Sequence, residues 1–277
     1  QQALAQPNPR NLQRVNEVLD YFQESLDVDV CYLLDASGTT IASSNRHSPD
    51  SFVGHNFAFR PYFQQALEGS SAKYMAVGTA SNRRGAYYSH PVYGTDSRDP
   101  LGVLVIKAPI SVMEKNIIQS SDGRTRLVGP YDVIFSSNRH DWLYQTLWEP
   151  SDADLRSISA SRQFGDGPWH WVGISRRGFT KAIDQAGNEY LMYSKTIYDF
   201  PGWQVVHLAD LKDISRSLFD PLVRTTGWLM MALCLFGGVA VYFLYRKASR
   251  EITRRQVAEA DLRESEKRYR TLYHNTP

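Results

Sequence analysis

One uncharged run of residues limits the folds open to this chain more than any other feature. From Gly227 to Tyr245 the sequence reads GWLMMALCLFGGVAVYFLY, nineteen residues without a charged side chain. At about 1.5 Å per residue, a helix of this length covers roughly 28 Å, close to the thickness of the hydrocarbon core of a bilayer. Buried helices of soluble proteins are usually shorter and carry a polar face. We therefore predict that residues 226–245 form a transmembrane helix in contact with membrane lipid.

The cations on the two sides of this run predict its orientation. Arg246, Lys247, Arg250, Arg254 and Arg255 follow it closely, whereas the twenty residues before it hold only three cations. Because cytoplasmic loops carry the excess of Lys and Arg, we expect residues 246–277 in the cytoplasm and residues 1 to about 224 outside it. The opening sequence QQALAQPNPR has no features of an export signal, so we expect a signal or membrane segment upstream of it.

The composition excludes several classes of protein. A formal charge of +2 over 277 residues, with scattered cations, gives no reason to expect nucleic acid as a partner. With 42% hydrophobic residues, the chain can build one large or two modest globular units. The two cysteines, Cys31 and Cys234, stand far apart in the chain in unlike surroundings, so we expect neither a disulfide nor a Cys-rich zinc site.

The part before the apolar run begins with an amphipathic helix at residues 1–27. Along Asn11–Leu26, apolar residues recur at alternate spacings of three and four; they are Leu12, Val15, Leu19, Phe22 and Leu26. This stripe can dock on a sheet of its own chain or pair with a second subunit, and the sequence leaves both open. The segment DVCYLLDASGTTIASS that follows predicts two strands joined at Ala36–Gly38.

Short helices and strands follow this hairpin. The expected helices are Tyr62–Glu68 and Ser111 to about Ser120. The expected strands are Ala86–Val92, Leu101–Ala108, Asp132–Ser136, Trp169–Ile174, Glu189–Thr196 and Gln204–Leu208. This order of elements predicts an α+β fold with antiparallel sheets.

A short repeat divides this part of the chain in two. IASSNRHS at Ile41–Ser48 returns as IFSSNRHD at Ile134–Asp141, with Ser-Ser-Asn-Arg-His shared in order. Each copy follows a predicted strand and opens a polar loop, which indicates two related modules in tandem. We therefore expect one PAS-like module at residues 28–125 and a second at residues 126–212.

The residues after the apolar run predict a linker helix. A 4-3-4-3 spacing typical of a coiled-coil seam is formed by Ala258, Leu262, Ser265, Tyr269 and Leu272. The alternative is one amphipathic helix that lies on the bilayer. The final ESEKRYRTLYHNTP resembles the linker helix and first residues of a PAS domain in bacterial signalling proteins. We therefore expect residues 246–277 to be a cytoplasmic linker helix and the start of a PAS domain.

Several stretches together resemble one family of sensors. They are LLDASGTTIASSN, GHNFAFRPYFQQALEG, YMAVGTASNRRGAYYSHPV and GVLVIKAPI. From about residue 10 to residue 210, the chain is similar to the double-Cache sensor domain of the bacterial C4-dicarboxylate sensor histidine kinases of the DctB type. The resemblance implies two Cache modules in the periplasm, an inner-membrane anchor and a homodimer. It also implies a small carboxylate ligand, such as succinate, malate or fumarate, and a response regulator reached through a kinase part beyond Pro277.

Arg60 is the first candidate for binding this ligand. It stands among aromatic residues in FAFRPYF, where a buried positive charge needs an anionic partner. A guanidinium can meet a carboxylate with two parallel hydrogen bonds. The residue types alone leave an internal salt bridge or a cation–π contact equally open, and the resemblance favours the ligand.

Lys107 is the second candidate. Alternation along the strand GVLVIK places Lys107 on one face with Val103 and Val105. Taken alone, a lysine at the end of a strand is expected to reach water. The resemblance instead implies that it contacts a ligand carboxylate, since the corresponding lysine of the family does so.

Five further residues complete the predicted ligand site; they are Phe57, Tyr62, Thr79, Tyr87 and Ser89. The family has a hydroxyl near the ligand at the position of Thr79. Ser89 lies in the strand YYSHP, where the pattern leaves open whether Tyr87 or Tyr88 faces the pocket. Phe57 stands where dicarboxylate sensors commonly have a tyrosine, and it cannot donate a hydrogen bond, which bears on the identity of the ligand.

Other functions stay open at this stage. The same sensor design can feed a diguanylate cyclase or a chemoreceptor, or read an amino acid, with Asp96 and Asp99 as the nearest partners of an ammonium group. An adhesion or scaffold ectodomain without a ligand predicts a pocket filled by its own side chains, with Arg60 paired internally. The spacing of the histidines and the absence of nucleophile, phosphate-loop and dinucleotide motifs predict no metal, no cofactor and no catalytic residue.

Overall fold

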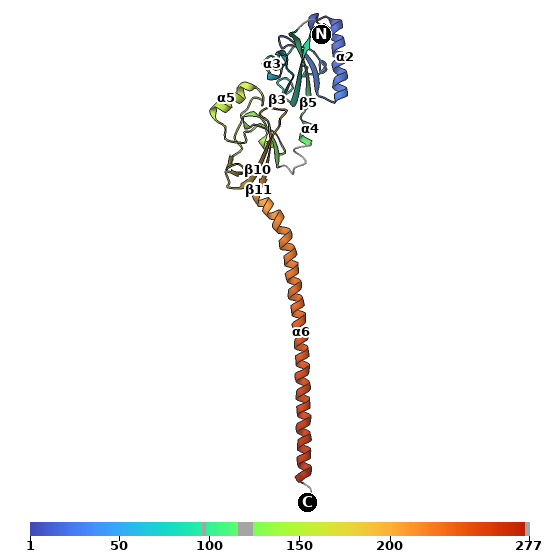
Figure 1. Cartoon of the computed structure of the whole chain (residues 1–277), viewed down its shortest axis with the longest axis vertical. Helices are drawn as coiled ribbons and strands as arrows, with labels where there is room; N and C mark the ends of the chain where they lie inside the picture. The colour runs from blue at the N-terminus through green and yellow to red at the C-terminus, as the bar shows by residue number, and fades with distance from the viewer. Residues whose placement is uncertain (96–97, 116–123, 275–277) are drawn as a thin grey trace. The chain divides into compact units, whose positions relative to one another are not determined.

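The structure is a computed structural model that describes residues 1–95, 98–115 and 124–274. It divides into two compact units, Gln1–Leu211 and Lys212–Pro277. The first unit holds two antiparallel sheets, which we name the distal sheet (β1–β5) and the proximal sheet (β6–β11) by their order along the chain toward the apolar helix. The predicted α+β fold, with an opening helix and a C-terminal apolar helix, is confirmed (Figure 1).

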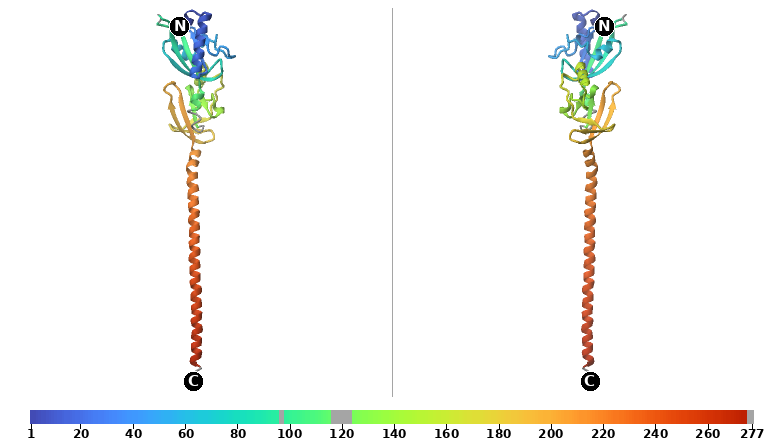
Figure 2. Two further views of the ribbon diagram at one scale, coloured as in Figure 1. Left: turned by 90° about the vertical axis from the view of Figure 1, so that its right-hand side faces the viewer. Right: turned by 90° about the vertical axis from the view of Figure 1, so that its left-hand side faces the viewer.

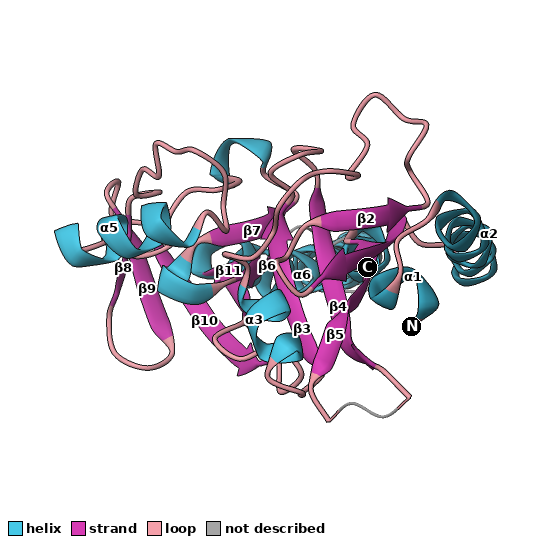
Figure 3. Cartoon of the chain, turned by 90° about the horizontal axis from the view of Figure 1, so that it is seen from above, coloured by secondary structure: helices cyan, strands magenta, loops and turns pink. Residues whose placement is uncertain are grey.

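The distal sheet has five strands in the order β2-β1-β5-β4-β3, and all neighbours are antiparallel. Its strands are β1 (Val30–Asp35), β2 (Thr40–Ser43), β3 (Ala72–Val77), β4 (Arg84–Tyr93) and β5 (Pro100–Pro109). Residues on both faces of β1 are buried, because helices cover the two sides of the sheet. Figure 3 shows these helices, α2 and α3, at different sides of the strands.

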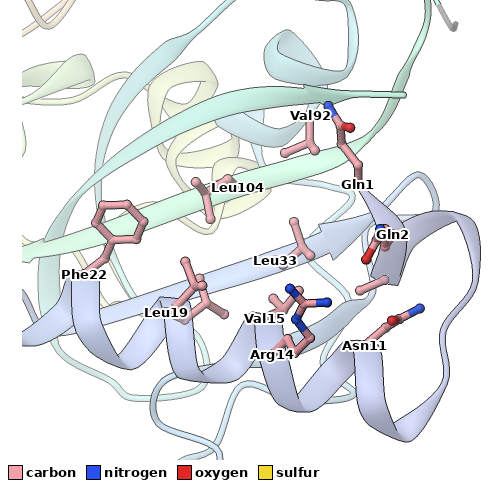
Figure 4. Close-up of a pocket in the computed structure, with 12 residues that line it drawn as sticks. Gln1, Gln2, Asn11, Arg14, Val15, Leu19, Phe22, Leu33, Val92 and Leu104 are labelled. Carbon is pink, nitrogen blue, oxygen red and sulfur yellow. The ribbon is translucent and has the colours of Figure 1, made fainter. Parts of the chain in front are cut away.

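Helix α2 (Pro9–Leu26) packs on one face of the distal sheet, and the short α1 (Gln2–Ala5) precedes it. The Asn8 side chain accepts the backbone N–H of Asn11 and so caps the start of α2. Figure 4 shows Leu19 turned toward Leu33 and Leu104 of the sheet, across a groove of about 470 Å³. Leu19 is only 2% exposed. The middle of the apolar stripe, Val15 and Leu19, therefore docks on the sheet of its own chain, whereas Phe22 and Leu26 are exposed.

Helix α3 (Pro61–Leu67) packs on the opposite face of the distal sheet. Tyr62, Phe63 and Ala66 of this helix share one apolar cluster with Tyr32 and Leu34 of β1. We call this side of the sheet the α3 face. It carries the candidate site described below.

The proximal sheet has six strands in the order β7-β6-β11-β10-β9-β8, again antiparallel. Its strands are β6 (Thr125–Val128), β7 (Ile134–Ser137), β8 (Ile174–Arg176), β9 (Lys181–Asp184), β10 (Glu189–Thr196) and β11 (Gln204–Asp210). The helical segments around it are α4 (Ser111–Met113), η3 (Pro130–Asp132), η4 (His140–Trp142) and α5 (Asp152–Ser161).

The repeated sequence lies at equivalent places in the two sheets. Its first copy begins in β2 and its second begins in β7. Each of these strands is at an edge of its sheet, pairs with the strand before it, and has an irregularity in that pairing. The equivalence supports the interpretation of the two sheets as related modules.

A shared apolar cluster joins the two sheets. It contains Met75, Val77 and Ala86 of the distal sheet, Leu127 and Phe135 of the proximal sheet, and Trp203 just before β11. Gln163, just after α5, also pairs with the edge strand β3. Its carbonyl accepts the Val77 N–H at 2.8 Å, and its side-chain amide donates to the Met75 carbonyl at 2.7 Å. The edge of the distal sheet at β3 is therefore partly covered by the segment after α5. We call the distal sheet with its helices the distal module, and the proximal sheet with the segments around it the proximal module.

Four predicted elements differ from the structure. The helix expected at residues 1–27 is divided into α1 and α2, because Pro7 and Pro9 lie at the break between them. The strand expected at Asp132–Ser136 begins only at Ile134, because a turn with positive φ at Tyr131 and Asp132 precedes it. The segment Trp169–Ile174 is mostly a loop, since its backbone bonds the loop residue Thr146 and sheet pairing starts only at Ile174. The helix expected from Ser111 is present as α4, and residues 116–120 of that prediction lie outside the described residues.

The chain continues into a single long helix, α6 (Leu211–His274), which Figure 2 shows as one continuous element. Within it, Thr225–Arg268 contains a stretch with a mean hydropathy of 2.0, and none of that stretch is buried. By length and composition this helix fits a transmembrane span. The last residues of the predicted PAS start, 275–277, lie outside the described residues.

Candidate ligand-binding site

The start of α3 positions Arg60. Arg60 is the N-cap residue and has extended backbone, with φ −78° and ψ 131°, and Pro61 is the first helical residue. A proline disfavours helical backbone in the residue before it, so the helix begins at Pro61 and no earlier. Because α3 is held on the sheet by Tyr62 and Phe63, Arg60 is brought to the α3 face, where it lines a cavity with Tyr32.

Arg60 is a buried cation whose hydrogen-bond partners are neutral. Its side chain is 2% exposed. One terminal nitrogen donates to the Val77 carbonyl at 2.9 Å and the other to the Arg162 carbonyl at 3.0 Å. Among the described residues, no Asp or Glu forms an ion pair with it. Carbonyl oxygens accept hydrogen bonds from the Arg60 guanidinium but do not neutralise its charge. An anion bound beside it would stabilise this buried charge.

The cavity beside Arg60 is small and mostly aromatic. Its volume is about 10 Å³, which is room for no more than about one water molecule. Its lining comes from four segments of the distal module: Tyr32, Phe52, Phe57, Arg60, Tyr62, Gly78, Thr79, Ala80 and Tyr87. A C4-dicarboxylate therefore requires side chains or the loop after β3 to move.

Three tyrosines of this cavity form one hydrogen-bonded and stacked group. The Tyr32 and Tyr62 hydroxyls lie 2.8 Å apart, and the rings of Tyr62 and Tyr87 stack with centroids 5.2 Å apart. Burial raises the pKa of Tyr62 to about 12 and also raises the pKa of Tyr32 and Tyr87. These hydroxyls therefore stay protonated at neutral pH. One member of the Tyr32–Tyr62 pair already donates to the other, so the second member and Tyr87 are able to donate hydrogen bonds to an anion.

Lys107 lies on the α3 face of β5, where register places it opposite Tyr87 of β4. Its side chain is 1% exposed, its ammonium donates to the Ser81 hydroxyl at 2.9 Å, and the Asp29 carboxylate is 3.8 Å away. Burial lowers the pKa of Lys107, and the charge of Asp29 opposes this shift. Unlike Arg60, Lys107 already has one acidic neighbour.

A second, polar pocket of about 170 Å³ adjoins Lys107. Two carboxylates, two cations and several amides and hydroxyls line it; they are Gln23, Asp29, Ser44, Asn45, Ser48, Asp50, Ser81, Arg83 and Lys107, together with Val30. This pocket can accept a small ligand that carries an anionic group, a cationic group or both.

The loop between β3 and β4, residues 78–83, connects the two cations. Thr79 and Ala80 line the cavity of Arg60, and the next residue, Ser81, bonds Lys107. A Cβ atom on Gly78 would lie 2.7 Å from the Ser81 hydroxyl and 2.9 Å from that of Tyr87. Both hydroxyls therefore lie beside Gly78, and neither leaves room for a side chain there. The loop therefore stands between two cationic ends on one face of the sheet.

The structure brings together most of the predicted site residues. Arg60, Phe57, Tyr62, Thr79 and Tyr87 line one cavity, and Lys107 lies beyond the loop that closes it. Ser89 does not line either pocket, because its hydroxyl donates to the Tyr62 carbonyl at 2.8 Å and ties β4 to α3.

The tyrosine that the sequence left open is Tyr87, which faces the cavity. Tyr88 points to the other side of β4, where its ring contacts Phe200 of the proximal module with centroids 6.3 Å apart. Of the acidic residues proposed for an ammonium group, Asp96 lies outside the described residues, and Asp99 lines neither pocket. The acidic residues that line the pocket beside Lys107 are instead Asp29 and Asp50.

Three polar contributors were missed: Tyr32, Ser81 and Asp29. Alternation in VCYLLD could have placed Tyr32 on one face of β1, opposite Val105 of β5. Ser81 and Asp29 belong to a turn and a strand start, and no local pattern shows that Lys107 lies between them.

Comparison with known proteins gives the class of this domain. Residues 2–218 match the Cache domain family, and the chain belongs to that family. The DctB sensor domain of a Vibrio cholerae histidine kinase, known from a crystal structure, aligns with a TM-score of 0.69 and 29% identity, over 75% of this chain and 82% of its own.

Two sequence relatives narrow the class further, and both are named C4-dicarboxylate transport sensor protein DctB. The protein of Rhizobium meliloti is 36% identical over 166 residues, which is 60% of this chain and 26% of the relative. That of Pseudomonas aeruginosa is 36% identical over 161 residues, 58% of this chain and 26% of the relative. The sensor domain is thus of the DctB type. The chain spans about a quarter of the length of these curated relatives.

Proposed function

We propose that this chain is the sensing and membrane-anchoring part of a bacterial sensor histidine kinase, and that its distal module binds a small carboxylate. C4-dicarboxylates such as succinate, malate and fumarate are the first candidates. The observation that carries the proposal is the burial of Arg60 on the α3 face with neutral partners only. The names of the two relatives support the choice of ligand.

The two cations give the proposed ligand two ends. Arg60 offers a planar fork to one carboxylate, and the Lys107 ammonium and the Ser81 hydroxyl are available to the other. The tyrosine hydroxyls of the aromatic cavity supply further donors. Charge-assisted hydrogen bonds contribute about 1.5–3 kcal/mol each, so three or four of them support a dissociation constant between about millimolar and micromolar after ordering costs.

Arg60 also provides a route from ligand to signal. Its hydrogen bond to the Arg162 carbonyl crosses from the distal to the proximal module. A ligand carboxylate competes with that carbonyl for the same donors, so the bound state weakens one contact between the modules. A ligand shifts an equilibrium only through different affinities for two states, and this competition supplies such a difference.

The remaining parts of the proposal concern the whole protein. Residues 1 to about 224 lie in the periplasm, α6 crosses the inner membrane among its lipids, and the C-terminal end lies in the cytoplasm. The protein acts as a homodimer and passes its signal to a response regulator through a kinase part. The apolar stretch of α6 and the type of the sensor domain support these assignments.

A ligand panel tests the proposal. The chain in lipid nanodiscs is titrated with succinate, malate, fumarate, acetate, leucine and alanine while thermal unfolding is recorded. A ligand that binds only the folded protein raises the unfolding midpoint with concentration. We expect a rise with at least one dicarboxylate and a smaller rise with acetate.

Two observations favour other outcomes of this panel. Asp29 and Asp50 beside Lys107 favour a ligand with an ammonium group, and then the amino acids raise the midpoint more than the dicarboxylates. The cavity of about 10 Å³ and the internal bonds of Arg60 are what a scaffold ectodomain without ligand predicts. In that case none of the three dicarboxylates and neither amino acid raises the midpoint, and the proposal fails.

A further inference from the structure

The proximal module contains a second buried arginine that lacks an acidic partner. Arg126 lies in β6 and is 6% exposed. One terminal nitrogen donates to the Arg124 carbonyl at 2.6 Å, while the buried Nε has no hydrogen-bond partner. Within the described residues, no carboxylate forms an ion pair with this guanidinium. An unpaired donor on a buried cation is uncommon in folded proteins, so it points to a missing acceptor.

A second guanidinium contacts the same indole ring as the first. The Cζ atoms of Arg126 and Arg139 each lie 4.4 Å from the ring of Trp142. Burial and the nearby charge of Arg139 lower the pKa of Arg126 to about 10. Arg139 pairs with Asp141 at 2.7 Å, but both side chains are more than half exposed, which makes this pair weak. The cluster therefore holds two like charges around one indole, and the carboxylate that pairs with it among the described residues, Asp141, is exposed.

A hydroxyl group completes this arrangement. Ser137 of β7 is the register partner of Arg126, so the two side chains leave the sheet on the same face. Its oxygen accepts the backbone N–H of Arg139 at 3.1 Å, and its own proton stays available for donation. The unpaired Nε, the Arg139 guanidinium and this hydroxyl can all donate hydrogen bonds. Donors beside two positive charges suit an anion as the ligand.

We propose that the proximal module has its own binding site for a small carboxylate at Arg126, Arg139 and Ser137. The half-exposed Arg139 side chain moves aside to admit the anion, because the Arg126 Nε is closed to solvent in this structure. The anion then accepts the unpaired Nε–H of Arg126 and lies beside the Arg139 guanidinium, which reduces the repulsion between the two charges. The ligand is a single carboxylate of about the size of acetate, because the two guanidiniums and the Ser137 hydroxyl serve one anionic group beside the Trp142 ring. This site is separate from the one at Arg60, which lies in the other module.

The simpler interpretation is a stack of two arginines on a tryptophan that binds nothing. The chain offers a matched case of that kind. Arg176 lies 4.5 Å from the ring of Trp148 with a side chain 53% exposed, and the Arg139 side chain is 52% exposed. In the part of the chain that the structure describes, no second guanidinium stacks on Trp148, so Arg176 serves as the control for a cation–π contact without an anion site.

The test uses the whole chain in nanodiscs, labelled with 5-fluorotryptophan at its six tryptophans. The Trp142 resonance is assigned by its loss in Trp142→Phe. Sodium acetate is then titrated to about 50 mM against sodium chloride at equal ionic strength, a range that covers millimolar affinity. We expect the Trp142 resonance to shift with saturation in acetate and not in chloride, in the unmodified chain and in Arg60→Ala.

Variants at the cluster make the expectation sharper. Arg139→Gln, an exposed change that leaves the core intact, weakens the response about fivefold or more, and Arg126→Met abolishes it. Arg176→Gln leaves it unchanged. The proposal is overturned if the Trp142 resonance does not shift with acetate, or if it shifts equally with chloride. An Arg139→Gln variant with unaltered acetate affinity also overturns it. Saturation by phosphate but not by acetate overturns the assignment to a carboxylate.

Discussion

Lys107 keeps its buried position because a glycine lies beside it. A Cβ atom on Gly85 would stand 2.7 Å from Cε of Lys107 and 3.0 Å from its Cγ, which is too close for either atom to stay in place. β4 therefore carries glycine where the side chain of Lys107 crosses it toward Ser81. The position of one end of the candidate site depends on the absence of a side chain on the neighbouring strand.

The Gly85→Ala variant tests this dependence. We expect it to lower the free energy of unfolding by about 1–3 kcal/mol through overpacking, and to weaken carboxylate binding because the ammonium moves. Urea denaturation of the single variant, of Lys107→Ala and of the double variant gives the coupling between the two sites. The double variant should recover part of the loss. Additive losses would mean that the two side chains do not compete for space.

The charge of Lys107 predicts that folding stability and ligand affinity change in opposite directions with pH. Because burial lowers the pKa of Lys107 below its ordinary 10.5, the folded state releases this proton at a lower pH than the unfolded state. As pH rises through the window between the lowered pKa and 10.5, unfolding takes up a proton, so the free energy of unfolding rises relative to Lys107→Met. An anionic ligand needs the charged ammonium, so its affinity falls over the same window.

Denaturation and calorimetric titrations at several alkaline pH values measure both effects. The exposed Lys181→Met serves as control and should behave as the unmodified chain does. Stability and affinity that change in the same direction with pH would contradict the role given to Lys107.

At this scale the sequence predicts the cations better than their partners. Arg60 is marked by the aromatic residues around it. Alternation gives only the face of the sheet on which Lys107 lies, and its place in the site was predicted from the family resemblance. Ser81 and Asp29 carry no such mark, because their contacts with Lys107 are made between segments far apart in the chain. The internal bonds of Arg60 to Val77 and Arg162 are equally hidden, since both acceptors are backbone carbonyls that any residue could supply.

Among the elements, the pairing of Gln163 with β3 holds the Arg162 carbonyl close to Arg60. The Gln163 side chain is buried and donates to the Met75 carbonyl, while its own carbonyl accepts the Val77 N–H. This short segment after α5 therefore stabilises the state in which Arg60 is bonded internally.

Gln163→Ala separates this segment from β3. Leaving the buried Met75 carbonyl without its donor costs about 1–3 kcal/mol of folding stability. If the Arg162 carbonyl competes with a ligand for Arg60, the same variant should bind a carboxylate more tightly, because the competing state is weakened. Gln64→Ala is the control, since its side chain also donates to a backbone carbonyl but is exposed. A loss of affinity in Gln163→Ala would argue against competition.

Helix α2 offers a matched pair of leucines for the packing of the opening helix. Leu19 is 2% exposed against the sheet, whereas Leu26 is 51% exposed at the end of the helix. We expect Leu19→Ala to lower the free energy of unfolding by about 2–5 kcal/mol and Leu26→Ala by much less. Chemical denaturation of the two variants checks this. Equal losses would mean that α2 is not seated on the sheet as the structure has it.

Elements with a strong local pattern were predicted well, and those fixed by tertiary contacts were not. α2, the first hairpin, β4, β5, β10 and β11 all follow apolar periodicity and lie within a few residues of their predicted bounds. α5 begins with a capping box of Ser151 and Asp154, a signal that could have revealed it. The three-residue β8 has two exposed residues and no pattern that separates it from a loop.

For the whole molecule, the account rests on one chain that carries two related sensor modules and a helix fit to cross a membrane. The uncharged run, the repeated Ser-Ser-Asn-Arg-His segment and the family resemblance together predicted this organisation. They could not predict the shared apolar cluster and the Arg60–Arg162 contact that join the two modules, because the residues involved come from both sheets and from the segment after α5.

Calorimetric titration of succinate into the full chain in nanodiscs tests the central claim, that Arg60 and Lys107 are two ends of one anion site. The unmodified chain should bind with an affinity between about millimolar and micromolar. Arg60→Ala and Lys107→Met should each weaken binding about tenfold or more, as expected for the loss of a charge-assisted contact, and the exposed Arg156→Ala should not. Circular dichroism confirms that each variant is folded. Succinate binding that survives unchanged in Arg60→Ala would contradict the account.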